Sequence, residues 1–121
     1  MLENLPLTTK IAATFRNAGR GVAFMFEELS IRFLAAATVL TIGAGVYFSI
    51  SALEWCAVLL AISLVWAAEG LNTALERLTD LVSPGFHPLA GKAKDIAAGA
   101  VLIASVGAFC VGLVVFLPYV V

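Results

Sequence analysis

Charged side chains are scarce in this 121-residue chain, which has only seven Lys and Arg and eight Asp and Glu residues. They make up 12% of the sequence, against roughly 25% in an average soluble domain, whereas 62% of the residues are hydrophobic. So few charges cannot cover the water-exposed surface of a soluble domain of this size. The composition therefore predicts a membrane protein, and the length predicts a single domain over residues 1–121.

Other scarce features exclude further classes of function. The formal net charge is −1, so the chain lacks the basic surface that binds nucleic acid, and no nucleic-acid partner is expected. Cys56 and Cys110 are the only two cysteines, and because each lies within an apolar run, neither a disulfide nor a zinc site is expected. The sequence also contains no Gly-rich phosphate loop that ends in lysine.

Three segments are long and apolar enough to cross a membrane as helices. The first, residues 33–53, has no charge over about 21 residues, which spans a hydrocarbon core of roughly 30 Å. The second, residues 55–80, completes a crossing only if the helix continues through Glu69. The third, residues 89–118, contains the uncharged stretch that begins at Ile96. We therefore expect an all-α fold with three transmembrane helices, the second of which carries a carboxylate at the membrane boundary.

All the basic residues lie before the first span or between the second and the third. They are Lys10, Arg16, Arg20, Arg32, Arg77, Lys92 and Lys94. Because cytoplasmic segments carry the excess of Lys and Arg, this distribution predicts that the N-terminus and the second connection are cytoplasmic and that the C-terminus is outside. The chemistry should therefore take place on the cytoplasmic side.

The segment before the first span, residues 8–29, has the periodicity of an amphipathic helix. Its apolar residues recur every three or four positions and fall on one side of a helix: Ile11, Phe15, Ala18, Val22, Met25, Phe26 and Leu29. Arg16, Arg20 and Glu27 fall on the other side. This pattern favours a helix that lies in the membrane interface with its apolar face toward the lipid. The alternative is a helix whose apolar face packs on a partner protein.

Four polar residues share one face of the second span. They are Glu69, Asn72, Glu76 and Asp80, at spacings of three, four and four residues. A charge near the middle of a bilayer costs roughly 2.5–3.5 kcal/mol, so this group of carboxylates needs a metal ion or a basic partner. The alternative is a solvated helix end that pairs with Arg77, Lys92 and Lys94. That alternative suits Asp80 better than Glu69, because apolar residues run directly up to Glu69.

A turn separates the second span from the third. Ser83-Pro84-Gly85 is typical of a turn. His87-Pro88 is typical of the start of a helix, because the backbone N–H that proline lacks would have no hydrogen-bond partner within the first turn. Lys94 follows within the first turns of this helix. It is expected to meet either the acidic face of the second span or an anionic ligand.

Glu28 and Arg32 stand one helical turn apart just before the first span. Such a spacing favours an ion pair within the helix. Glu28 is also expected at the same membrane depth as Glu76, so the two carboxylates could instead share a divalent ion.

The stretch from Ala68 to Ala104, AEGLNTALERLTDLVSPGFHPLAGKAKDIAAGAVLIA, resembles the signature of the small bacterial integral-membrane lipid kinases, the diacylglycerol kinase and undecaprenol kinase family. It joins an E-x-x-N-x-x-x-E-x-x-x-D helix to an H-P-L-A-x-x-A-K-D-x-A-A-G-A-V helix, and weaker similarity covers Phe15 to Arg32. The second motif is more similar to the undecaprenol kinase branch. The resemblance implies a surface helix and three membrane helices in the bacterial cytoplasmic (inner) membrane, assembled as a homotrimer with active sites between neighbouring subunits.

The resemblance also implies phosphoryl transfer from ATP, with magnesium, to the hydroxyl of a membrane lipid. Undecaprenol is the preferred acceptor, and diacylglycerol is the alternative. Such a reaction needs mainly positioning and charge neutralisation, so the missing phosphate loop is no obstacle. A non-enzymatic proton-coupled transporter, with Glu69 as a proton relay, is the other class of function considered. It does not explain why Glu76, Asp80, Lys94 and Asp95 gather at one membrane face.

The family's residue roles map onto this sequence as follows. Glu69 matches the general base, and Asn72 would orient Glu69 or the lipid hydroxyl. Glu28 and Glu76 match the metal carboxylates, whose hard oxygen atoms suit magnesium. The implied nucleotide-binding residues are Asn17, Glu28, Glu76, Gly85, Phe86, His87, Lys94 and Asp95, and the implied lipid-binding residues are Lys10 and Glu69.

Overall fold

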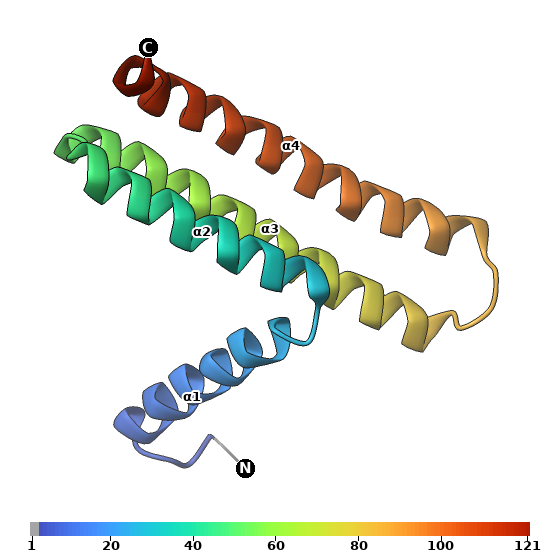
Figure 1. Ribbon diagram of the computed structural model, residues 1–121. Coiled ribbons are helices and arrows are strands. Elements are labelled where there is room, and N and C mark those ends of the chain that lie inside the picture. Colours follow the sequence, from blue (N-terminus) through green and yellow to red (C-terminus); the bar gives the residue numbers. More distant parts are fainter. Residues whose placement is uncertain (1–2) are drawn as a thin grey trace.

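The computed structural model describes residues 3–121, and within them the chain forms four α-helices. Helix α1 spans Leu7–Met25, α2 spans Leu29–Phe48, α3 spans Ala52–Val82 and α4 spans Pro88–Val120. Figure 1 shows α2, α3 and α4 running side by side, while α1 branches away from the start of α2. The predicted all-α fold is confirmed.

Helices α2, α3 and α4 are long and apolar enough to cross a membrane. They contain 20, 31 and 33 residues. At a rise of 1.5 Å per residue even α2 measures about 30 Å, which matches the hydrocarbon thickness of a typical bilayer. The three membrane-length helices and the preceding N-terminal helix agree with the sequence prediction.

The α2–α3 connection, residues 49–51, begins earlier than the predicted spans of residues 33–53 and 55–80 placed it. Helix α2 starts at Leu29 and ends at Phe48, instead of covering residues 33–53, and Ser49 closes it with a left-handed backbone (φ 51°). Helix α3 then begins at Ala52 because Ser51 and Glu54 form a capping box: Glu54 N donates to Ser51 Oγ, and Ser51 N donates to Glu54 Oε1.

The first helix also ends earlier than predicted. A turn over Phe26, Glu27 and Glu28 separates α1 from α2, because the amides of these residues donate to carbonyl oxygens only three residues back, at 3.0–3.2 Å. Glu28 has an extended backbone and is the residue that precedes α2. The single helix predicted over residues 8–29 is therefore wrong at its C-terminal end, and α1 stops at Met25.

Helix α3 is the central element of the bundle. It packs along most of α4, and it contacts α2 and α1 over shorter stretches. Few side chains are buried in the single chain, and many large apolar side chains of the three long helices remain exposed. An apolar surface of this extent requires lipid or further protein to cover it.

Close contacts fix the α2–α3 hairpin. Gly45 is buried on α2, and a Cβ atom at this position would lie 2.6 Å from Cη2 of Trp55 on α3. Near the middle of the hairpin, Trp66 Nε1 donates to Thr38 Oγ1 at 2.9 Å. Glycine at position 45 is therefore what allows the two helices to approach each other at this end.

The end of α4 is tied to the start of α3. Tyr119 Oη donates to Glu54 Oε1 at 2.6 Å, and the Phe48 ring lies against the rings of Phe116 and Tyr119, with centroids 6.3 and 5.6 Å apart. Pro118 does not end α4, which continues to Val120. These contacts close the end of the bundle opposite to the α3–α4 loop (Figure 1).

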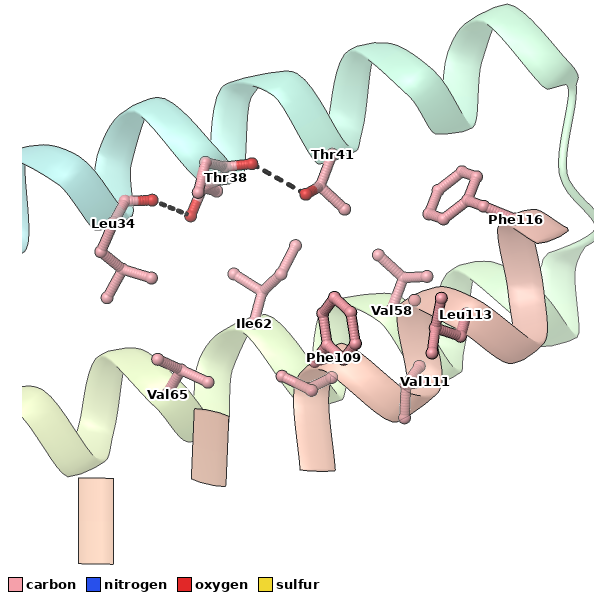
Figure 2. A pocket seen from close by; sticks show the side chains of 14 residues that line it. Leu34, Thr38, Thr41, Val58, Ile62, Val65, Phe109, Val111, Leu113 and Phe116 are labelled. Carbon is pink, nitrogen blue, oxygen red and sulfur yellow. Dashed lines mark hydrogen bonds between the residues drawn. The ribbon is translucent and has the colours of Figure 1, made fainter. Parts of the chain in front are cut away.

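An apolar cavity of about 290 Å³ lies between α2, α3 and α4. Figure 2 shows that its lining includes Val58 and Ile62 of α3 and Phe109 of α4. The hydroxyl groups of Thr38 and Thr41 donate to carbonyl oxygens of their own helix, each at 2.8 Å (Figure 2). These two polar side chains therefore satisfy their hydrogen bonds inside α2 and add little polarity to the cavity.

Candidate active site

The polar residues of α3 and α4 gather at the end of the bundle that carries the α3–α4 loop (Figure 1). His87 starts α4 here: its Nδ1 atom accepts a hydrogen bond from Leu89 N at 3.1 Å, and Pro88 occupies the first helical position. The predicted helix start is thus confirmed. This cap directs the beginning of α4 back along the last turns of α3.

Lys94 joins the two helices. Its Nζ atom donates to Asp80 Oδ1 at 2.5 Å, which pairs the first turns of α4 with the last turns of α3. Of the two partners expected for Lys94, the structure shows the acidic face of α3. Asp80 is 63% exposed, so an incoming anion can compete for the ammonium group without a large desolvation penalty.

A cavity of about 300 Å³ opens beside this ion pair. Among the residues that line it are Asp80, Gly85, Phe86, His87 and Lys94. Four residues expected to bind nucleotide, Gly85, Phe86, His87 and Lys94, therefore lie together. The sequence interpretation did not include Asp80 in this group, although its spacing of four residues from Glu76 placed it on the same face of α3.

Asn72 and Glu76 contact each other on α3. Asn72 Nδ2 donates to Glu76 Oε1 at 3.5 Å, and both side chains are half-buried. The Asn72 Oδ1 atom is buried and has no hydrogen-bond partner among the described residues. Because an unpaired buried acceptor is costly, a donor is expected to reach Asn72 in the working protein.

Glu69 lies where the α1–α2 turn covers α3. Ser30 Oγ donates to Glu69 Oε2 at 3.5 Å. The next residue is Gly70, and a Cβ atom there would lie 3.0 Å from Cε of Met25, so glycine lets the end of α1 pack against α3 at this level. The Phe26 ring also lies 5.8 Å from the Trp66 ring, between centroids.

Glu28 is held by an arginine of α3. One guanidinium nitrogen of Arg77, Nη2, lies 3.1 Å from Glu28 Oε1 and 3.1 Å from Glu27 Oε2. The predicted ion pair between Glu28 and Arg32 is therefore wrong, because the turn before α2 directs Glu28 toward α3, and Arg32 Nε donates to the Phe26 carbonyl at 3.0 Å instead. The contact brings Glu28 to the turn of α3 that contains Glu76.

Three of the predicted site residues lie apart from this arrangement. Lys10 Nζ donates to the carbonyl oxygen of Glu3 at 3.0 Å, and Asn17 is an exposed residue of α1. Asp95 is exposed on α4, and it is not among the residues that line the cavity beside Lys94. Within residues 3–121 the three side chains form no hydrogen bond or ion pair with Glu69, Glu76 or Lys94.

Glu28 and Glu76, the residues expected to bind metal, provide carboxylate oxygen atoms but do not form a complete set of metal ligands. In the described part of the chain, no three His, Cys, Asp or Glu side chains are arranged to hold a metal ion. Magnesium at phosphoryl-transfer sites is usually bound by one or two carboxylates together with phosphate oxygens and water. The donor chemistry of Glu28 and Glu76 therefore fits a magnesium ion that arrives with a nucleotide.

Three membrane-length helices carry a row of carboxylates at one end, with a lysine-lined cavity beside it. Comparison with known proteins identifies the family. Residues 16–116 match the family described as prokaryotic diacylglycerol kinase, and the chain belongs to this family. The resemblance noted in residues 68–104 is confirmed, and the protein is an enzyme, a lipid kinase, rather than a proton-coupled transporter.

Three relatives illustrate the similarity. The undecaprenol kinase of Bacillus subtilis (strain 168) is 40% identical over 106 residues, which are 87% of this chain and 86% of that protein. The diacylglycerol kinase of Synechocystis sp. is 38% identical over 110 residues, which are 89% of this chain and 63% of that longer protein. The diacylglycerol kinase of Escherichia coli (strain K12) is 29% identical over 105 residues, 86% of each chain.

Proposed function

We propose that the protein transfers the γ-phosphoryl group of ATP to the hydroxyl of undecaprenol in a bacterial cytoplasmic membrane. The observation that carries this proposal is the row of Glu69, Asn72 and Glu76 on α3, which leads from the membrane-length part of the helix to the cavity beside Lys94. The similarity to an undecaprenol kinase over most of both chains supports undecaprenol as the acceptor. The similarity to two diacylglycerol kinases supports diacylglycerol as the alternative.

The nucleotide would occupy the cavity at the α3–α4 loop. Lys94 would exchange Asp80 for the phosphates of ATP, and Gly85, Phe86 and His87 would line the site. Asn17 and Asp95 would approach the nucleotide only after a change in the positions of α1 and α4 or from a neighbouring subunit. Glu28 and Glu76 would hold magnesium, which when bound neutralises phosphate charge.

The lipid would react at Glu69. Its hydroxyl oxygen forms a bond to the γ-phosphorus, the bond from that phosphorus to the ADP oxygen breaks, and the hydroxyl proton passes to the Glu69 carboxylate. Asn72 lies one helical turn away, and its unpaired Oδ1 atom would accept a hydrogen bond from the lipid head group. This arrangement supports the proposed roles of Glu69 as base and Asn72 as orienting residue.

Helix α1 would lie in the membrane interface as an amphipathic helix, with Lys10 near the lipid head groups. Its large apolar side chains support this placement, because Leu7, Phe15 and Val22 are exposed in the single chain. The exposed apolar faces of the three long helices likewise support assembly of three copies into a homotrimer. Neighbouring copies would then complete each active site.

The orientation in the membrane is open to a direct test. Gly85→Cys and Val121→Cys would each be made in a chain whose native Cys56 and Cys110 are replaced by alanine. In intact cells, a membrane-impermeant thiol reagent should modify the cysteine at position 121 and not the one at position 85, because the distribution of basic residues predicts a cytoplasmic α3–α4 loop. The opposite labelling pattern would reverse the orientation.

The acceptor is tested by supplying purified protein in mixed micelles with γ-labelled ATP, magnesium, and either undecaprenol or diacylglycerol. We expect label in both lipids with a higher kcat/KM for undecaprenol, because an apolar site discriminates weakly between hydrocarbon chains, by only about 1–3 kcal/mol per methylene. If kcat/KM were about tenfold or more higher for diacylglycerol than for undecaprenol, diacylglycerol would replace undecaprenol as the proposed acceptor. No label in either lipid would contradict the proposed activity itself.

A further inference from the structure

A serine from the start of α2 touches the carboxylate that the proposed reaction needs. Ser30 Oγ lies 3.5 Å from Glu69 Oε2, across a separation of 39 residues in the chain. We propose that Ser30 is a positioning residue, which holds Glu69 so that its second oxygen, Oε1, can accept the proton of the lipid hydroxyl. The proposal rests on the role of Glu69 as the base in the proposed function.

Ser30 is the second residue of α2, so the carbonyl oxygen four residues earlier belongs to the turn that precedes the helix. A helical serine or threonine usually donates to the carbonyl oxygen four residues earlier, as Thr14 does to Lys10 and Thr41 does to Ala37. For Ser30 that carbonyl belongs to Phe26, and it accepts a hydrogen bond from Arg32 Nε at 3.0 Å. The Ser30 hydroxyl donates instead to Glu69 of α3.

The backbone around Ser30 is anchored on both sides. The next residue, Ile31, has no exposed surface and is the most completely buried side chain described. On the other side, the Glu27 and Glu28 carboxylates both form ion pairs with Arg77 of α3. Because its backbone is held in place, the Ser30 hydroxyl can restrict the orientation of the flexible Glu69 side chain. A hydroxyl on a mobile segment would move together with the glutamate and would not restrict it.

The chemical effect of the contact is geometric. A glutamate carboxylate at the edge of a bilayer has three rotatable side-chain bonds, and only some of its orientations point an oxygen at the incoming hydroxyl. Small errors in the position of a reacting group, on the order of 1 Å, can cost about a hundredfold in rate. Loss of the Ser30 hydroxyl should therefore lower kcat without changing the affinity for nucleotide, because the nucleotide cavity lies at the α3–α4 loop.

The test compares Ser30→Ala, Ser30→Thr and the control Thr41→Ala, whose hydroxyl is bonded within its own helix. Lipid phosphorylation is measured in mixed micelles with saturating lipid. We expect Ser30→Ala to lower kcat by about tenfold or more with an unchanged KM for magnesium-ATP, and Ser30→Thr to restore most of the loss. Thr41→Ala should behave like the unsubstituted protein. An unchanged kcat in Ser30→Ala would overturn the proposal, as would equal losses in the alanine and threonine variants.

A double-variant cycle separates this inference from the proposed function. If Ser30 acts through Glu69, then Ser30→Ala should have no further effect in a Glu69→Gln background, where the rate is already reduced. An undiminished effect in that background would show that Ser30 acts independently of Glu69 and would refute the positioning role. Full activity of Glu69→Gln alone would instead contradict the role of Glu69 as the base.

Discussion

Gly45→Ala is expected to destabilise the α2–α3 hairpin, by an amount that follows from the contacts around position 45. The added Cβ atom would lie 2.6 Å from Cη2 and 2.9 Å from Cζ2 of Trp55, and 3.2 Å from Cδ1 of Ile50. Carbon atoms pack at about 3.5–4.0 Å, so the indole ring would have to move by about 1 Å. Because the ring is rigid, the two helices must separate or the ring must leave its position. Overpacking of this kind costs about 1–3 kcal/mol.

Gly43→Ala is the matched control for this prediction. A Cβ atom at position 43 would meet no heavy atom within 4 Å, although the residue lies on the same helix only two positions away. Removing glycine from a helix interior should stabilise the protein by about 0.5–1 kcal/mol. Gly45→Ala gains the same helix propensity, so the two alanine variants should differ by the overpacking cost alone, roughly 1–3 kcal/mol, in favour of Gly43→Ala.

Thermal unfolding in detergent micelles, followed by tryptophan fluorescence, provides the measurement. Gly45→Ala should unfold at a lower temperature than the unsubstituted protein, and Gly43→Ala at the same or a higher temperature. Kinase activity per folded molecule should be unchanged in both, because the hairpin turn lies at the end of the bundle opposite to the candidate site. Equal unfolding temperatures for the two variants would refute the close approach of α2 and α3 at Gly45.

The remaining predictions concern the site. Glu69→Gln should keep nucleotide binding and lower the rate of lipid phosphorylation by about a hundred- to ten-thousandfold in single-turnover assays. A near-normal rate would mean that another residue is the base. Glu28→Gln and Glu76→Gln should each weaken magnesium-nucleotide binding and combine less than additively in titrations with a nucleotide analogue, since residues that act as one unit are not additive; fully additive losses would separate the two carboxylates. Lys94→Gln should raise the KM for ATP, and its control Lys92→Gln should not; equal effects would mean that only general positive charge is needed.

Hydropathy predicted the presence of the helices well and their ends less well. The sequence interpretation began the first span at residue 33, directly after Arg32, whereas α2 starts at Leu29. A charge near a helix end does not stop the helix, because that end lies in water, so the uncharged stretch is shorter than the helix itself. At the end of α1, apolar residues continue in helical spacing through Phe26 to Leu29, and the pattern therefore could not reveal the turn between them.

In the candidate site, too, the arrangement of residues along one helix could be predicted from the sequence, whereas the contacts between helices could not. The shared face of Glu69, Asn72 and Glu76 follows from helical spacing alone, and it could be predicted. The partners of Glu28 could not, because the spacing of four residues favoured Arg32, whereas the folded chain uses Arg77, 49 residues away. The contact of Ser30 with Glu69 left no signal in the sequence for the same reason, since it depends on how the start of α2 packs against α3.

The candidate site residues on α3 require a fixed number of residues between them. Glu69 and Glu76 are seven residues apart, and each residue rotates an α-helix by about 100° and lengthens it by 1.5 Å. Insertion of one residue between them would turn the proposed base, Glu69, away from the proposed metal ligand, Glu76, although the helix would still be long enough to cross the bilayer. Insertions or deletions of one residue closer to Ala52 would keep the spacing within the row, although they would rotate the row by about 100° relative to the start of α3 and shift it by about 1.5 Å along the helix. The site therefore constrains the length of α3 far more tightly between these two glutamates than the membrane does.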